Sequence, residues 1–225
     1  MWEGGFIMIY SNERKQQLSG WLRKHERASY DSPLRLQKFL FFYEALWKTS
    51  NISCDFHKLK GYVRGPVFSA VWGDYTKERE EFDRAVKEQY MVHKDKVYPN
   101  IAKQAAFIIK ILSESELSQL THQYDIWNSK ASRIMAGEPQ VELCEADFSE
   151  KDKALTATLS QMYPDTLASS SIVYQFGDKN FVLPKEVAKQ LTEQHMDTLA
   201  ILADFKELHN PVFVDIDERG VLLVD

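Results

Sequence analysis

The sequence has little glycine and almost no cysteine, with 9 and 2 residues respectively in a chain of 225. No glycine-rich phosphate loop is present, which argues against a nucleotide enzyme of the Rossmann or P-loop kind. Two cysteines in a chain of this length do not make the disulfide framework of a small secreted protein. A Gly-x-Ser-x-Gly elbow and a His-Glu-x-x-His zinc helix are also missing, so the sequence shows no catalytic site of these kinds.

Long apolar runs are absent too, since nothing approaches the ~20 consecutive apolar residues that span a membrane. The short run at residues 6–10 follows Glu3 and lacks a basic start and a cleavage region, so we do not interpret it as a secretory signal. Met8 could serve as an alternative start, which would make the first seven residues dispensable. We expect a cytoplasmic protein with no membrane partner.

The sequence also lacks a complete set of metal ligands. Cys54 and His57 have the spacing of a metal-binding pair, but no second Cys/His pair supplies the other two ligands of a zinc site. Asp215 and Asp217 resemble the start of a calcium loop, yet Arg219 stands where that loop needs an oxygen ligand. We therefore expect neither a metal ion nor a cofactor.

Charge is distributed unevenly along the chain, whose formal net charge is −5. Residues 1–100 hold 17 basic and 13 acidic side chains, or +4, and residues 101–225 hold 11 and 20, or −9. Nucleic-acid-binding proteins usually present a basic face, so the acidic half argues against such a partner. It suits a basic protein partner, or equally a solvated face that keeps the protein soluble.

Residues 34–47 carry many more large apolar side chains than a single stripe needs, which predicts a buried central helix. Ser32 can cap its free amides, and Pro33 suits its first position. We expect this helix to end near residues 49–51. Lys38 lies inside it, so the amine either reaches the surface along its stem or pairs with a buried acid.

Residues 61–67 predict a stiff turn that leads into a second apolar helix. Gly65 permits backbone angles closed to other residues, and Pro66 presets the first turn of the helix that follows. Tyr62, Arg64 and Trp72 are of the residue types that dominate interface energies. A turn packed by its own aromatic side chains explains them equally well.

The chain is predicted to be mainly α (α+β), with a helical domain at residues 1–165 and a small α/β extension at 166–225, packed on the first. Further predictions are a basic surface helix at 11–28, a charged exposed helix at 76–89, a strand or loop at 90–98, an apolar helix at 101–112, a capping box at 113–116, a helix at 150–162 capped by Ser149, and a linker at 164–171. In the extension we expect strands at 172–176 and 181–183, a helical region at 184–208 bent near Glu193, and a hairpin at 212–224.

Three segments resemble, in order and spacing, the antitoxin domain family called Panacea or SocA-like. They are residues 36–40 with Tyr43, residues 64–67 with Trp72, and residues 116–122 with Trp127. The resemblance covers about residues 34–133. Two positions depart from the family pattern: Ile126 replaces a proline that commonly precedes the tryptophan, and Arg64 replaces an aromatic residue often found before the Gly-Pro pair.

The resemblance implies a non-enzymatic antitoxin that neutralises a small protein toxin encoded nearby by direct contact. Family members of the SocA type also deliver the toxin to a protease, and the resemblance leaves open whether a protease takes part here. The toxin's identity and a homo-oligomeric state also stay open. The residues expected to bind the partner are Lys38, Tyr62, Arg64, Gly65, Pro66, Trp72, His122 and Trp127.

Two functions of other classes remain as alternatives. Thr121, His122 and Asp125 contain the hydroxyl, imidazole and carboxylate of a hydrolase-type site. The first two are neighbours and point about a third of a turn apart on a helix, so a core histidine is the competing interpretation. The second alternative is a DNA-binding regulator that uses the basic helix at residues 14–27.

Overall fold

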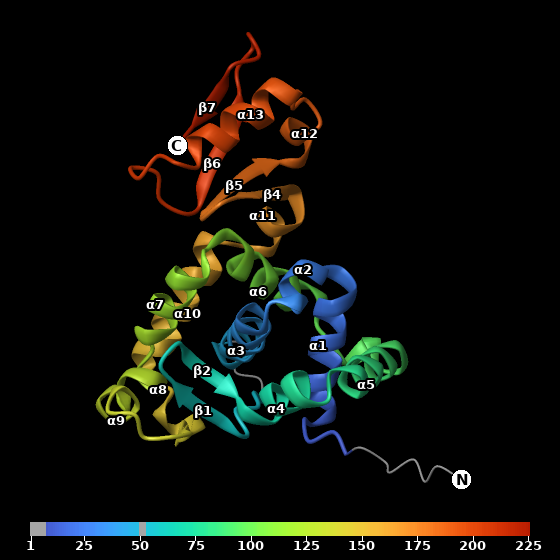
Figure 1. Ribbon diagram of the computed structural model, residues 1–225, viewed down its shortest axis with the longest axis vertical. Helices are drawn as coiled ribbons and strands as arrows, with labels where there is room; N and C mark the ends of the chain where they lie inside the picture. The colour runs from blue at the N-terminus through green and yellow to red at the C-terminus, as the bar shows by residue number, and fades with distance from the viewer. Residues whose placement is uncertain (1–7, 50–52) are drawn as a thin grey trace.

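The computed structural model describes residues 8–49 and 53–225, which form a helical body and a smaller C-terminal α/β extension (Figure 1). The helices are α1 (Glu13–His25), α2 (Arg27–Asp31), α3 (Pro33–Thr49), α4 (Ser69–Lys77), α5 (Arg79–Val92), α6 (Pro99–Ile111), α7 (Glu114–His122), α8 (Asp125–Asn128), α9 (Ala131–Met135), α10 (Glu150–Met162), α11 (Asp165–Ser170), α12 (Lys185–Ala188) and α13 (Glu193–Leu202), with short 3₁₀ turns at Lys94–Lys96 and Glu145–Asp147. The strands are β1 (Leu59–Tyr62), β2 (Gly65–Phe68), β3 (Val141–Glu142), β4 (Ser171–Phe176), β5 (Lys179–Pro184), β6 (Val212–Ile216) and β7 (Leu222–Val224). The predicted mainly α class is confirmed.

Helix α3 is the centre of the body, as its apolar sequence predicts. The Ser32 hydroxyl accepts a hydrogen bond from the backbone N–H of Arg35 at 3.3 Å, and Pro33 is the first helical residue. Every side chain from Arg35 to Trp47 is buried, because α1, α6, α10 and β2 surround the helix (Figure 1). Thr49 is its last residue, and the rest of the predicted end, residues 50–51, lies outside the described residues.

Helix α1 is not the surface helix that its basic residues suggest. Residues 15–22 are all buried, and the helix packs most closely on α5. A Cβ at Gly20 would lie 2.1 Å from the Val86 carbonyl oxygen, so the absence of a side chain lets the two helices approach. Two of its basic side chains are neutralised locally, since Arg14 and Lys15 contact Glu44. Lys24 near its end is exposed, so the outward basic surface that a DNA-binding regulator would use is smaller than predicted.

The turn predicted within residues 61–67 is present at residues 63–64, but Gly65 and Pro66 follow it as part of a strand and do not form it. Gly65 and Pro66 are the first two residues of β2, which pairs antiparallel with β1 through the turn at residues 63–64. Helix α4 follows from Ser69. Strand β1 also pairs antiparallel with β3, which lies far along the chain, and this gives a three-stranded sheet in the order β2-β1-β3. No local sequence pattern indicated this pairing.

Three other predicted segments need correction. Residues 90–92 continue α5 in place of the predicted strand or loop, because buried Tyr90 extends the stripe of Phe82 and Val86 by one more turn. Most of the predicted linker at 164–171 is the short helix α11. The helical region expected to reach residue 208 ends at Leu202, after a break between α12 and α13.

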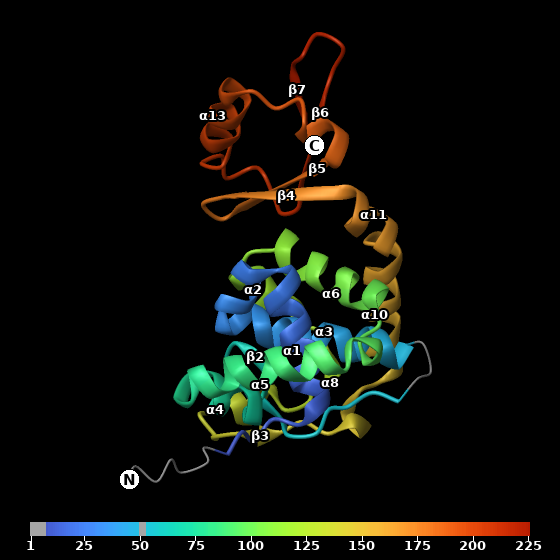
Figure 2. The same cartoon turned by 90° about the vertical axis from the view of Figure 1, so that its right-hand side faces the viewer.

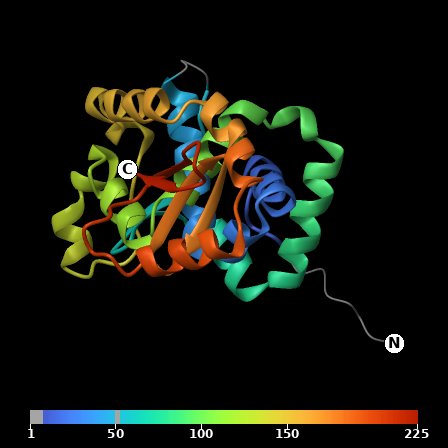
Figure 3. The same cartoon turned by 90° about the horizontal axis from the view of Figure 1, so that it is seen from above.

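The extension is a four-stranded sheet in the order β4-β5-β6-β7, with β5 and β6 parallel. The predicted strands and the final hairpin are confirmed. Helix α13 lies beside this sheet (Figures 2 and 3). Residues of the sheet and of α13 form an apolar cluster of their own, and Val182 of β5 joins the main core. Asn210 also bonds to Glu116 of α7 at 2.8 Å, so the extension contacts the body through polar as well as apolar groups. No helix in the described part of the chain is long and apolar enough to cross a membrane.

Candidate functional site

A pocket of ≈ 400 Å³ lies between α3, the β1–β2 hairpin, α4 and the start of α7. Five of the predicted partner-binding residues line it, although they come from four separate elements and one turn. They are Lys38, Tyr62, Arg64, Pro66 and Trp72. Most of the remaining lining is apolar, with Arg64 and Glu114 forming an ion pair of 3.0 Å at the exposed rim. Two of the three segments that carry the resemblance thus contribute residues to one surface.

The side chain of Lys38 adopts neither of the two arrangements that the sequence predicts for it. Its side chain is 1% exposed, so the amine does not reach the surface, and no carboxylate pairs with it among the described residues. The Nζ atom donates to the Arg64 carbonyl oxygen at 2.6 Å and to Thr121 Oγ1 at 3.0 Å. Burial, with a smaller contribution from the charge of Arg64, lowers the pKa of Lys38 to about 7.

Gly65 is required beside this amine for two reasons. Its φ angle is +104°, in a region that residues with side chains rarely adopt. A Cβ placed there would also lie 2.2 Å from Lys38 Nζ and 2.5 Å from Thr121 Oγ1. The hairpin can therefore close over the lysine only with glycine at this position.

We expect Gly65→Ala to lower the free energy of unfolding by about 1–3 kcal/mol, because the variant must hold a strained backbone angle. Urea unfolding monitored by circular dichroism measures the change. Gly73→Ala is the matched control, since Gly73 lies within α4, where a Cβ would meet nothing within 4 Å. Alanine there is expected to stabilise the helix by roughly 0.5–1 kcal/mol. Equal stabilities of the two variants would contradict this interpretation of Gly65.

His122 and Trp127 do not line the pocket but support the hairpin that forms it. Their rings stack with centroids 3.8 Å apart, and Trp127 Nε1 donates to the Tyr62 carbonyl oxygen at 3.0 Å. Burial and the nearby charge of Lys38 lower the pKa of His122. The structure therefore places two of the predicted partner-binding residues behind the surface.

The three groups of the hydrolase alternative are not joined to one another by any hydrogen bond among the described residues. The Thr121 hydroxyl lies 3.0 Å from the carbonyl oxygens of Leu117 and Ser118, to which it can donate. The Asp125 carboxylate accepts from Ser149 Oγ at 2.8 Å and Lys151 Nζ at 3.0 Å. The imidazole of His122 stacks on Trp127 instead.

Metal-ligating side chains do not assemble elsewhere in the described ranges, where no group of three or more His, Cys, Asp or Glu residues could hold an ion. Cys54 is a free thiol, and burial raises its pKa to about 11. The Asp217 carboxylate accepts from the backbone N–H groups of Arg219 and Val221, at 2.9 and 2.8 Å. The calcium-like segment is therefore the turn of the β6–β7 hairpin, as predicted.

Two polar residues of the site, Gln37 and Glu114, were not among the residues expected to bind the partner. Gln37 lines the pocket, and its Oε1 accepts from the backbone N–H of Phe68 at 2.8 Å, which fastens β2 to α3. Its place beside Lys38 in the helix is the one signal that could have indicated it. Glu114 has no such signal, because its position opposite Arg64 depends on how α7 packs.

The surface around this pocket combines a rigid hairpin, an apolar floor and a charged rim. These features have to be interpreted from their own geometry. Comparison of the chain with protein-family models, curated proteins and solved structures finds no match.

Proposed function

We propose that this chain is a cytoplasmic, non-enzymatic antitoxin that neutralises a small protein toxin encoded nearby by direct binding. The single observation that carries the proposal is the convergence of Lys38, Tyr62, Arg64, Pro66 and Trp72 on one apolar pocket. Lys38, Arg64, Pro66 and Trp72 belong to two of the three segments that carry the resemblance to the Panacea domain, and Tyr62 lies two residues before the second of them. Their meeting at one accessible surface is what a binding function requires.

The pocket has the properties of a site that receives an anchoring side chain. Trp72 is 39% exposed and Val63 57% exposed, so apolar surface extends from the pocket onto the hairpin turn. A leucine or aromatic side chain of the toxin would fill the pocket, where contacts are fully desolvated and contribute most to affinity. Arg64 and Glu114 at the rim would fix its orientation through polar groups of the toxin.

The rest of the interface would spread around this pocket over about 1,600 Å² in total, the usual size of a specific complex. A basic toxin suits the chain best, because residues 101–225 carry a charge of −9. Complementary charge raises the association rate more than the final affinity. The hairpin is held by Gln37 and Trp127, so little ordering is needed on binding.

The first experiment is co-expression of this chain with its neighbouring open reading frame under separately inducible promoters, with growth as the readout. The neighbour alone is expected to stop growth, and this chain to restore it. A harmless neighbour, or growth arrest that this chain does not relieve, would overturn the proposal. Following the toxin's half-life in the same cells distinguishes simple neutralisation from delivery to a protease.

The pocket is tested by Trp72→Ala and Arg64→Ala, each expected to weaken toxin binding by about tenfold or more, as anchors of this type do. Phe205→Ala is the control for Trp72, since Phe205 is a half-exposed aromatic residue of the extension. Arg133→Ala is the control for Arg64, because Arg133 also forms an exposed ion pair, with Glu138. Isothermal titration calorimetry with the purified toxin measures all four affinities. Equal losses in the test and control variants would exclude this pocket.

A further inference from the structure

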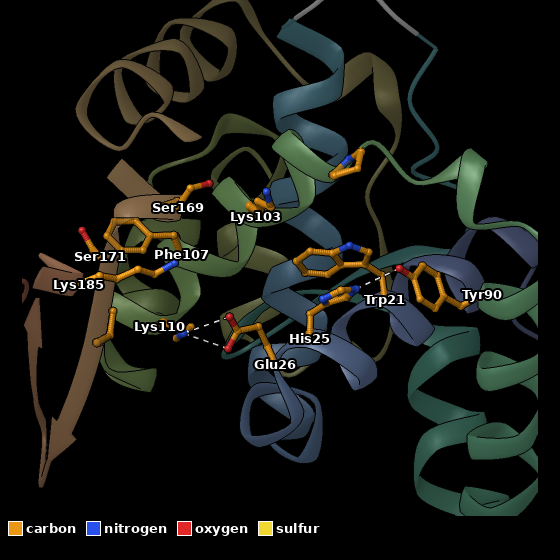
Figure 4. Close-up of a pocket in the computed structure, with 13 residues that line it drawn as sticks. Trp21, His25, Glu26, Tyr90, Lys103, Phe107, Lys110, Ser169, Ser171 and Lys185 are labelled. Carbon is orange, nitrogen blue, oxygen red and sulfur yellow. Dashed lines mark hydrogen bonds and ion pairs between the residues drawn. The ribbon is translucent and has the colours of Figure 1, made fainter. Parts of the chain in front are cut away.

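A second pocket, of ≈ 340 Å³, lies where the helical body meets the C-terminal extension (Figure 4). Helices α1, α5 and α6 form one side of it, and α11, β4 and the start of α12 form the other. It shares no lining residue with the pocket at the β1–β2 hairpin. Nothing in the proposed antitoxin function uses it.

Three lysines from both sides face this pocket. Lys103 and Lys110 belong to α6, and Lys185 begins α12. Glu26 is the single acidic residue among the described lining residues, and it pairs with Lys110 at 3.0 Å. Among the described residues no ion pair involves Lys103 or Lys185, so both charges are available. Such a concentration of positive charge is unusual in a chain whose second half carries −9.

The other lining side chains are notably aromatic. Trp21 and His25 stack with ring centroids 4.7 Å apart, and His25 Nε2 lies 3.1 Å from the Tyr90 hydroxyl (Figure 4). The side chain of Lys185 extends towards Phe107 on the other side. Desolvation is the main cause that lowers the pKa of His25; the charges of Lys24 and Lys103 add to it, and that of Glu26 opposes it. Trp21, Tyr90 and Phe107 are only 4–8% exposed, so the ring that the pocket offers next to the unpaired ammonium groups is that of exposed His25.

We propose that this pocket binds a nucleoside phosphate, with the base on the exposed ring of His25 and the phosphates between Lys103 and Lys185. Planar rings stack on aromatic side chains regardless of the base, and lysine is a common phosphate ligand. The volume lies within the range of small-molecule sites. In this pocket lysine ammonium groups would bind the phosphates in place of the backbone amides of a glycine-rich loop. A chain with few glycines can therefore still bind a phosphate.

The ligand would touch both parts of the molecule, because Lys103 lies in the body and Lys185 in the extension. Binding would therefore hold the extension in place and raise the thermal stability of the whole chain. Other contacts, such as that of Asn210 with Glu116, also hold the extension on the body. An empty site would therefore not release the extension by itself. We accordingly expect the ligand to change stability without changing the fold.

The test is calorimetric titration of the full chain with AMP, ADP and ATP, beside adenosine and inorganic tripolyphosphate. Affinity is expected to rise with each added phosphate, while adenosine and tripolyphosphate bind at least about tenfold more weakly than ATP. Tripolyphosphate that binds as tightly as ATP would reduce the site to a simple anion site. Tighter binding of a single-stranded oligonucleotide than of any mononucleotide would replace the small ligand by a nucleic acid. Either outcome, or no binding at all, would overturn the proposal.

The variants are Lys103→Ala and Lys185→Ala, each expected to weaken ATP binding about tenfold or more. Both side chains are exposed, so their truncation leaves the core intact. Lys87→Ala is the matched control, since Lys87 is an exposed lysine on α5 that does not line the pocket. Thermal unfolding of each variant without ligand verifies the fold. An unchanged affinity in both test variants, or an equal loss in the control, would contradict the assignment.

Discussion

Replacing Glu44 with alanine is expected to lower the free energy of unfolding by about 3–5 kcal/mol, the largest single effect anticipated for this chain. Glu44 is fully buried in α3, where one carboxylate serves two cations. Arg14 binds it with two hydrogen bonds of 2.8 and 2.7 Å, and Lys15 with one of 2.6 Å. The carboxylate also accepts the backbone N–H of Asp55 at 3.0 Å.

The size of the effect follows from what the variant leaves behind. Lys15 is itself buried, and its Nζ atom also donates to the Asp55 carbonyl oxygen at 2.6 Å and lies 3.4 Å from the Asp55 carboxylate. Removing Glu44 leaves the buried ammonium group of Lys15 with one nearby carboxylate in place of two. The free-energy cost of a buried charge without its partner is far larger than the net stabilisation that the intact ion pair provides. Helix α1 is fastened to α3 by these contacts, so its packing on α5 would loosen as well.

Urea unfolding of the purified protein measures the change, with Arg133→Ala as the control. Arg133 and Glu138 form an exposed ion pair, whose loss is expected to cost about 0–1 kcal/mol. A cost for Glu44→Ala no greater than that of the control would show that the buried cluster does not stabilise the fold.

The second large effect concerns Lys38 and pH. Between pH 7.5 and pH 9.5 the free energy of unfolding of the native protein is expected to rise relative to that of Lys38→Met. The difference between the two proteins is expected to change by up to roughly 2 kcal/mol. The pKa of Lys38 falls from about 10.4 in an unfolded chain to about 7 in the fold. Burial is the main cause, since the amine has a carbonyl and a hydroxyl oxygen as partners but no counter-charge.

The direction follows from proton linkage. Below pH 7 the amine is protonated in both states, and the fold bears the full penalty of a buried charge. Between pH 7 and about 10.4 the unfolded chain keeps a proton that the folded chain has lost, so raising the pH favours the fold. One proton corresponds to about 1.4 kcal/mol per pH unit.

Measuring both proteins at each pH isolates this one group. Cys54 also changes the slope near the upper limit, because its raised pKa makes stability fall as the unfolded thiol ionises, but it is present in both proteins. The variant is expected to be the more stable protein at pH 7 and to lose this advantage as the pH rises. Parallel pH profiles would mean that the folded lysine keeps its proton, which requires a partner other than Arg64 and Thr121.

Several elements were predictable because their signals are local. The density of large apolar residues indicates α3, and the capping patterns at Ser113 and Ser149 indicate where α7 and α10 begin. The β6–β7 hairpin follows from alternation around a short polar turn. Each of these depends on residues within about one helix or hairpin length, and tertiary contacts agreed with the local preference.

The candidate site could be predicted only in part. Lys38, Arg64 and Trp72 were indicated by the resemblance, and they line one pocket. His122 and Trp127 were indicated by the same resemblance, yet they lie behind it because they stack on each other. The difference between facing a pocket and supporting it is a matter of side-chain direction, which spacing along the chain does not contain.

Helical content, the central helix, the capped helix starts and the uneven charge can all be obtained from the amino-acid order, since each arises from neighbouring residues. Tertiary packing alone decides the burial of α1, the pairing of β3 with β1, the neutral environment of Lys38 and the second pocket between Trp21, Lys103 and Lys185. These features join residues 20 to more than 100 positions apart. Their contacts depend on how whole elements fill space, and no local pattern encodes that.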